Sequence, residues 1–354
     1  MEPQSSTEQT SSPERDAHLL RNGIIWTVAL LVLLLAVGLA VPDLREVLDR
    51  AAHAQASWLI VAVVLEVASC LGYVATVRLV LRRGPRRDVR WLAWAEMAFG
   101  AVVPVGGAGG LAVGAWAMRA WGISWSRIAN RSAVIFLLTS AVNGVVLMLA
   151  GLGIAAGLGA SGKGIEYGVI PAVATAAGLG FFLALPQWAE RSTRVRRGSG
   201  GRLTTALVRA AQWVSDSEAM LRRPDWRLLG TVGYLLFDIA VLWACLRAVG
   251  VTPSVLAVVV GYQVGYLANL IPIPGGVGVL EGGLLGALLL YGLPAAPTAA
   301  AVVLYHAIAL WVPSLGGTIG FARLRRAVTT RAPLIARAGG AQPESALEPA
   351  EIAA

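Results

Sequence analysis

NLIPIPGGVGVLEGG, residues 269–283, interrupts an apolar run that extends from residue 255 to residue 292. Pro272 and Pro274 lack the backbone N–H donor, and each glycine in a helix interior costs about 1 kcal/mol relative to alanine. Opened backbone is tolerated at membrane depth only where protein buries it or where it lines a cavity. Glu281 follows the break, and a carboxylate that faces lipid is strongly unfavourable. A broken membrane helix beside an acidic residue is typical of a translocation site.

The composition indicates an integral membrane protein, because 56% of the 354 residues are hydrophobic and only 14% are charged. Cys70 and Cys245 lie in apolar runs far apart in the sequence, and His18, His53 and His306 have no paired spacing. We therefore predict no metal and no cofactor. The net charge of +9 comes from arginines between apolar runs, which is the pattern of cytoplasmic loops. The expected partners are membrane lipids, and no nucleic acid is expected.

Apolar runs define the predicted fold class, an all-α polytopic helical membrane protein. A helix needs about 20 apolar residues to cross a bilayer. Six segments meet this requirement, at residues 24–41, 57–81, 132–159, 165–186, 228–250 and 298–320. Two further segments, 91–118 and 255–292, are each interrupted by prolines and glycines, and their halves are too short to cross alone. We expect about six full spans and two re-entrant helical hairpins.

The distribution of arginine predicts the topology. The predicted loop 82–90 holds five arginines, and the predicted loop 187–227 holds nine arginines against four acidic residues. The tail after 321 is also basic, whereas the predicted loop 42–56 is slightly acidic. These charges are satisfied when both termini are cytoplasmic in a multi-pass protein of the cell membrane. That topology requires the two interrupted segments to enter from opposite sides of the membrane.

The predicted domains follow from this topology. The first repeat, 57–159, and the second, 228–321, would form an inverted repeat, which is the architecture of many secondary transporters. Both belong to a transmembrane domain at 21–321. The remaining predicted regions are a disordered cytoplasmic N-terminus at 1–20, a basic cytoplasmic linker at 187–227 with an amphipathic helix at 203–223, and a disordered cytoplasmic tail at 322–354.

Glycine spacing supports the internal repeat. Gly106-Gly107-x-Gly109 in the first interrupted segment matches Gly275-Gly276-x-Gly278 in the second, 169 residues later. Small residues also recur at every fourth position in both segments, which lets membrane helices approach closely.

The segment from Pro272 to Gly282 resembles the P-x-P-G-G-x-G-x-x-E signature of the lysylphosphatidylglycerol synthase transmembrane (flippase-like) family. Pro104 and the glycines after it look like the first hairpin of that family, and Tyr305-His306 looks like its closing Y-R pair. The resemblance extends from about residue 24 to residue 321. It implies a lipid-translocating membrane domain, which bifunctional members use to hand an aminoacylated phospholipid to the outer leaflet.

This sequence departs from the family pattern at two places. In the family, an acidic residue and an arginine usually follow the first-hairpin glycines, whereas this sequence has Leu111 and Gly114 in that region. The closing arginine of the family is replaced by His306. A soluble synthase domain accompanies the membrane domain in bifunctional members. We find no room for such a domain and expect a stand-alone member that is not an enzyme, without catalytic residues.

Candidate residues follow from these patterns and from the resemblance. An anionic headgroup would meet Arg119 and Arg131 at the cytoplasmic mouth, then helix N-termini and opened backbone in both hairpins. Glu281 would contact a cationic headgroup or act as a proton-coupled gate. The residues predicted to bind substrate are Glu96, Pro104, Gly106, Gly107, Arg119, Arg131, Asn269, Pro272, Pro274, Gly275, Gly276, Gly278, Glu281, Tyr305 and His306.

Carboxylates within the predicted spans are candidates for proton or ion coupling, because intramembrane charges usually serve function. These are Glu66, Asp238 and Glu281. The alternative for Glu66 and Asp238 is a buried ion pair with Arg78, Arg119 or Arg247.

Two other functions stay open at this point. The chain could be a membrane-embedded transferase or hydrolase that acts on a lipid-linked substrate, although its carboxylates are scattered. It could also be a non-transporting partner subunit of a lipid-modifying enzyme. The sequence alone does not name the lipid.

Overall fold

The computed structural model describes residues 42–81, 86–102, 108–158, 168–195, 202–222, 225–267 and 279–339, and the regular elements in these ranges are helices. The chain forms two compact units, Met1–His53 and Ala54–Ala354. The described part of the first unit contains helix α2 (Pro42–Ala52), whereas the sequence predicts a loop at 42–56. Arg50 lies 2.9 Å from Glu46 one turn earlier, and such a pair supports a short helix.

Five helices in the described part of the second unit are long and apolar enough to cross a membrane. They are α3 (Ala56–Val80), α6 (Trp125–Ala155), the Ile170–Trp188 part of α7 (Ile170–Val195), α9 (Leu228–Ala248), and the Ala295–Thr330 part of α12 (Ala295–Gly339). They confirm five of the six predicted spans as apolar helices. The sixth, 24–41, lies outside the described residues.

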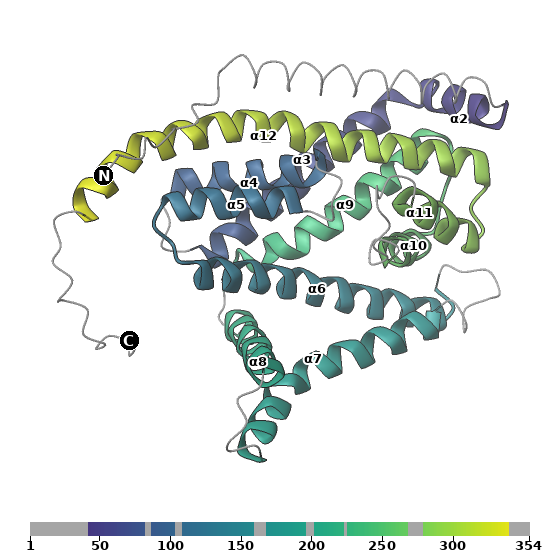
Figure 1. Ribbon diagram of the computed structural model, residues 1–354. Helices are drawn as coiled ribbons and strands as arrows, with labels where there is room; N and C mark the ends of the chain where they lie inside the picture. Colours follow the sequence, from purple (N-terminus) through teal and green to yellow (C-terminus); the bar gives the residue numbers. More distant parts are fainter. Residues whose placement is uncertain are drawn as a thin grey trace, which may run out of the picture. The chain divides into compact units, whose positions relative to one another are not determined.

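Shorter helices form two hairpins between these spans (Figure 1). The first consists of α4 (Arg86–Val102) and α5 (Ala108–Ala120), and the second of α10 (Val255–Leu267) and α11 (Val279–Leu290). Both predicted interruptions are confirmed, since each interrupted segment is two helices and not one. The Pro/Gly clusters between them, at 103–107 and 268–278, lie outside the described residues. Each half of the unit therefore follows the order long helix, hairpin, long helix.

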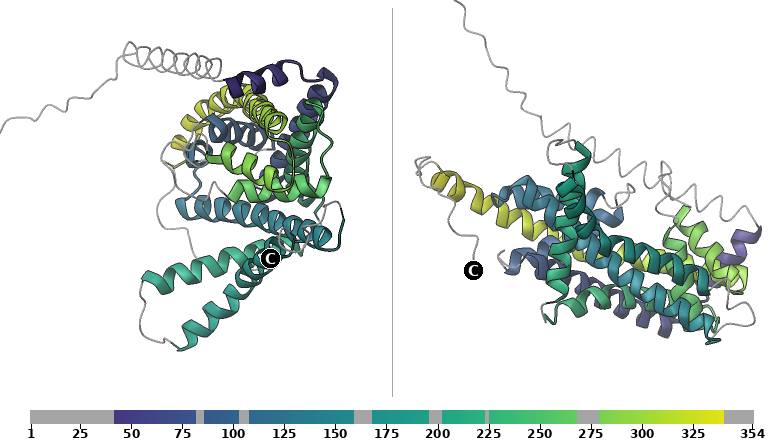
Figure 2. Two further views of the ribbon diagram at one scale, coloured as in Figure 1. Left: turned by 90° about the vertical axis from the view of Figure 1, so that its right-hand side faces the viewer. Right: turned by 90° about the horizontal axis from the view of Figure 1, so that it is seen from below.

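Helices α3 and α9 form the most extensive helix contact of the described residues and run antiparallel. The start of α3 meets the end of α9, where the Gln55 N–H donates to the Ala248 carbonyl at 2.9 Å. The end of α3 meets the start of α9, where the hydroxyls of Thr76 and Thr231 lie 3.0 Å apart. The midpoints of the two helices therefore lie at a similar level along the pair. Figure 2 draws the same helices from two further sides.

Glycine sets the spacing of the central helices. A Cβ added to Gly72 on α3 would lie 2.6 Å from a backbone oxygen of α9, so the two backbones are in direct contact. On α12, Gly316 and Gly317 leave room for the ring and backbone of Trp94 on α4 and for the neighbouring Ala98. Small residues at such contacts are how membrane helices approach closely.

Helix α8 (Arg202–Leu221) confirms the helix predicted at 203–223 and contacts both α6 and α7. Among the α8 residues whose burial the structure describes, Ala211, Val214 and Ser217 are buried, whereas Leu221 is exposed. Part of the apolar face of this amphipathic helix is therefore covered by protein.

The prediction of a disordered tail from residue 322 is wrong for 322–339, because α12 continues to Gly339. Leu324 and Val328 are buried in an apolar cluster with side chains of α4, α5 and α6, including Leu92 and Met118. The physical reason is that Leu324 and Val328 lie one helical turn apart and form an apolar stripe, which arginines flank. Residues 340–354 lie outside the described part of the chain.

Large apolar side chains are also exposed on the spans. Ile60 and Val64 on α3, Phe136 on α6 and Leu315 on α12 are each more than 60% exposed. A helix that is apolar on its buried and exposed faces is typical of a membrane span.

Candidate functional site

Apart from Asp88 in the first turn of α4, charged side chains of the described residues lie inside the helical bundle at two places. Glu66, Glu96 and Arg131 are each more than nine-tenths buried, and Asp238 is partly buried. Charges within membrane helices are rare because desolvation is costly, so these residues define the candidate site. They form two clusters, which we call the hairpin cluster (Tyr73, Glu96 and Arg131) and the central cluster (Glu66, Cys70, Asp238, Tyr262 and Tyr305).

The hairpin cluster joins α3, α4 and α6. Arg131 on α6 donates from Nη1 to Glu96 Oε1 at 2.6 Å and from Nη2 to Glu96 Oε2 at 2.7 Å. The Tyr73 hydroxyl donates to Glu96 Oε2 at 3.2 Å. This two-pronged geometry is the strongest form of an ion pair. Arg131 Nε is buried and has no hydrogen-bond partner among the described residues.

Two glycines on α5 make room for this ion pair. A Cβ on Gly110 would lie 2.5 Å from the Glu96 carbonyl oxygen. A Cβ on Gly114 would overlap Glu96 Oε1 and would lie 3.4 Å from Arg131 Nη1. Gly114 therefore occupies a position where any larger residue displaces the carboxylate, which is a physical reason for glycine in this region of the first hairpin.

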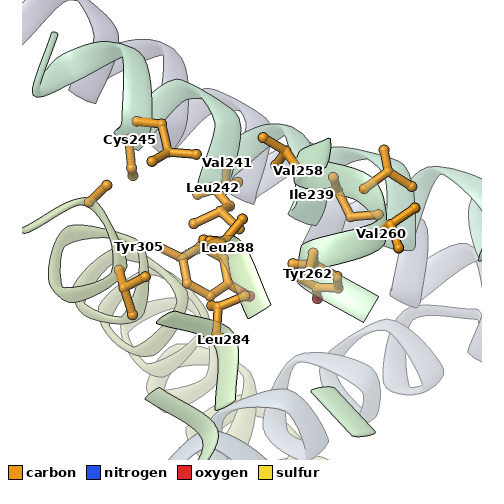
Figure 3. Packing of buried hydrophobic residues seen from close by; sticks show 14 of the residues in the cluster. Ile239, Val241, Leu242, Cys245, Val258, Val260, Tyr262, Leu284, Leu288 and Tyr305 are labelled. Atoms are coloured by element: carbon orange, nitrogen blue, oxygen red, sulfur yellow. The ribbon is translucent and has the colours of Figure 1, made fainter. Parts of the chain in front are cut away.

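The central cluster is organised by Asp238, near the middle of α9. The hydroxyl of Tyr262 on α10 donates a hydrogen bond to Asp238 Oδ2. The hydroxyl of Tyr305 on α12 lies 3.1 Å from Oδ1 and 3.2 Å from Oδ2. The two tyrosine rings meet edge to face at a centroid distance of 6.2 Å. Figure 3 shows both rings within the buried apolar cluster that also contains Leu284 and Leu288 of α11.

Glu66 lies near the middle of α3, at the level of Asp238 on its antiparallel neighbour. Its Oε1 accepts a weak hydrogen bond from the Cys70 thiol at 3.7 Å. Its Oε2 is buried and has no hydrogen-bond partner among the described residues. Glu66 and Asp238 are close enough to interact electrostatically.

The arginines considered as partners for these carboxylates lie elsewhere. Arg119 donates to the Ile123 carbonyl at 2.9 Å, and the Arg247 guanidinium lies over the rings of Trp58 and Trp243. Neither Glu66 nor Asp238 forms an ion pair within the described residues. The alternative interpretation, a buried ion pair with Arg78, Arg119 or Arg247, is therefore not found there.

Other predicted site residues fall into three groups. Tyr305 belongs to the central cluster, and its neighbour His306 has Nδ1 3.0 Å from the Val302 carbonyl oxygen. Arg119 is exposed whereas Arg131 is buried, so the two do not line one open mouth as expected. The third group lies outside the described residues and comprises Pro104, Gly106, Gly107, Asn269, Pro272, Pro274, Gly275, Gly276, Gly278 and the side chain of Glu281.

Three residues of the two clusters were not predicted from the sequence: Cys70, Tyr73 and Tyr262. Tyr73 and Cys70 follow Glu66 by seven and four residues, so helical spacing places all three on one side of α3. This helical spacing from Glu66 is the sequence pattern that could have identified Cys70 and Tyr73. Nothing in the sequence marks Tyr262, whose role depends on how α10 lies against α9.

Comparisons with known proteins agree with this architecture. Residues 24–317 match the family described as the lysylphosphatidylglycerol synthase TM region. A 90-residue stretch is 36% identical to a UPF0104 membrane protein of Methanothermobacter thermautotrophicus (strain Delta H). That stretch covers 25% of this chain and 26% of the archaeal protein, so the match spans about a quarter of each.

Proposed function

Because the chain belongs to the lysylphosphatidylglycerol synthase TM-region family, we propose that it moves a lipid with an anionic or aminoacylated headgroup between the two leaflets of the cell membrane. The observation that carries the proposal is the burial of Glu66, Glu96 and Arg131 inside apolar helices, beside two interrupted hairpins. Intramembrane charges and broken helices together are typical of transport pathways.

The hairpins supply the proposed pathway. At 1.5 Å per residue, the 13 residues of α10 extend about 20 Å, less than the roughly 30 Å of a bilayer core. In our proposal both hairpins are re-entrant, with α4 and α5 entering from the cytoplasm and α10 and α11 from the opposite side. Both chain termini are then cytoplasmic.

Arg131 is the residue best suited to a lipid phosphate. A guanidinium binds carboxylate and phosphate with the same two-pronged geometry, so a phosphate can replace Glu96 in the pair. In this proposal the released Glu96 then faces a cationic headgroup, if the lipid carries one. The acyl chains stay in the bilayer, against the exposed apolar side chains of the spans.

Translocation of fluorescent lipids in proteoliposomes tests the function. Phosphatidylglycerol, aminoacylated phosphatidylglycerol and a polyprenyl phosphate are offered separately, and a membrane-impermeant quencher reports the leaflet. We expect one lipid to be translocated, and Glu281→Gln to slow its movement at least tenfold. Glu46→Gln, the same chemical change at the exposed Glu46 of α2, serves as the matched control and should not slow it.

Two outcomes would replace the proposal. A chemically altered lipid in mass spectra would favour a transferase or hydrolase. No movement and no alteration of any lipid by folded protein, together with co-purification of a lipid-modifying enzyme, would favour a partner subunit.

A further inference from the structure

Four helices bring their side chains to the central cluster. Glu66 comes from α3, Asp238 from α9, Tyr262 from α10 and Tyr305 from α12. Both carboxylates lie near the middle of their helices, which is the depth farthest from water if α3 and α9 cross the membrane. This cluster therefore links the central helix pair to the second hairpin and to the last span.

The charge of this cluster is not balanced within the described residues. Glu66 and Asp238 interact electrostatically, and neither of them forms an ion pair with another described residue. The other titratable groups around the pair are Cys70 on α3, Cys245 on α9, Tyr262 on α10, and Tyr305 and His306 on α12. Two neighbouring carboxylates in a low-dielectric interior do not both remain ionised without a cation.

Hydrogen bonding distinguishes the two carboxylates. Both oxygens of Asp238 accept from tyrosine hydroxyls, and hydrogen bonds to a charged group stabilise that charge. Among the described residues, Glu66 accepts only from a thiol, which is a weak donor, and its buried Oε2 has no hydrogen-bond partner. A metal ion requires several oxygen ligands, whereas a proton requires a single oxygen atom. Glu66 Oε2 is such an oxygen atom.

We propose that Glu66 and Asp238 form a proton-binding site in which Glu66 carries the proton on Oε2 and Asp238 stays ionised. A proton taken from water forms the O–H bond, and its loss returns Glu66 to a carboxylate beside the Asp238 carboxylate. The repulsion that results acts on Asp238, which Tyr262 ties to α10. The charge of Glu66 is thereby coupled to the position of the second hairpin. This coupling to transport rests on the proposed function, but the proton site does not.

Infrared spectroscopy of purified protein in lipid nanodiscs tests the site directly. A protonated carboxyl group has a C=O stretching band distinct from that of a carboxylate. We expect wild-type protein at neutral pH to show this band, Glu66→Gln to abolish it, and Glu46→Gln to leave it unchanged. Size-exclusion chromatography confirms that each variant is folded, and the neutral, isosteric glutamine suits the site if Glu66 is protonated.

Each result decides the proposal. A band that persists in Glu66→Gln, or its absence from wild type at neutral pH, would overturn the assignment. Loss of the band in Asp238→Asn but not in Glu66→Gln would move the proton to Asp238 and also overturn it. Translocation is measured separately under a pH gradient, where Glu66→Gln should remove any dependence on the gradient. If wild type moves no lipid yet Glu66→Gln abolishes the band, the proton site stands and the proposed function fails.

Discussion

Arg131 on α6 and Glu96 on α4 are joined by two parallel hydrogen bonds of 2.6 and 2.7 Å, and both side chains are almost fully buried. Removing two charges from water costs several kcal/mol each, and good geometry offsets that cost only while both partners are present. The pair attaches the first hairpin to a membrane-spanning helix, so its integrity matters both for stability and for the proposed binding of phosphate.

Removing one partner of this pair should destabilise the protein far more than removing both. Glu96→Gln leaves Arg131 as a buried, unpaired charge, which costs about 3–5 kcal/mol. The double variant Glu96→Gln/Arg131→Met should recover most of that loss. Unfolding free energies in detergent measure the difference, with Glu46→Gln as a surface control expected to cost about 1 kcal/mol or less. A double variant as unstable as the single one would contradict this account.

Gly114 should be intolerant of even one methyl group. Gly114→Ala places a Cβ where Glu96 Oε1 lies, so we expect a loss of about 1–3 kcal/mol through overpacking. Gly286 on α11 is the matched control, because a Cβ there meets nothing within 4 Å. Gly286→Ala should be neutral or stabilising by up to about 1 kcal/mol. Equal melting temperatures for the two variants would refute the assigned packing.

The tyrosine hydroxyls at Asp238 should contribute to stability only while Asp238 is charged. Tyr305→Phe and Tyr262→Phe each remove a hydrogen bond to the carboxylate, worth about 1.5–3 kcal/mol. In an Asp238→Asn background the same changes should cost much less. A double-mutant cycle measures this coupling, expected at about 0.5–3 kcal/mol. A coupling energy near zero would show that the hydroxyls do not stabilise the charge.

The spans and hairpins were predictable because hydrophobicity and backbone chemistry act locally. An apolar run of about 20 residues predicts a membrane helix wherever it occurs, and α3 and α9 lie within a few residues of the predicted limits. Prolines and glycines predict an interruption without reference to any partner. The helix α2 was missed since its charged residues resemble a loop until the pairing of Glu46 with Arg50 is considered.

The contacts of the site were less predictable because they depend on tertiary packing. Glu66 and Asp238 could be identified from burial in apolar runs, but Glu96 and Arg131 are 35 positions apart and no spacing rule joins them. Arg131 was expected near Arg119 at an open mouth. The close approach of α5 to α4 at Gly110, and the space that Gly114 leaves for the Glu96 carboxylate, let Glu96 pair with Arg131, which lies in the interior instead.

The extension of α12 was missed for a different reason, because its arginines obscure an apolar stripe. Leu324 and Val328 are one helical turn apart and buried, whereas Arg325 and Arg326 between them are exposed. Periodicity indicates a helix here even though average hydrophobicity does not. The stripe packs in one cluster with apolar side chains of the first hairpin, so α12 belongs to the folded core at least as far as Val328.

Shortening Leu324 should therefore destabilise the protein although it lies beyond the predicted end of the last span. Leu324 is completely buried, and Leu324→Ala should cost about 2–5 kcal/mol through the cavity it leaves beside Leu92 and Met118. Arg325→Ala, at the next and exposed position, should change stability by about 0.5 kcal/mol or less. Thermal unfolding in detergent compares the two variants. If Leu324→Ala unfolds at the same temperature as Arg325→Ala, residues after 320 do not pack on the first hairpin.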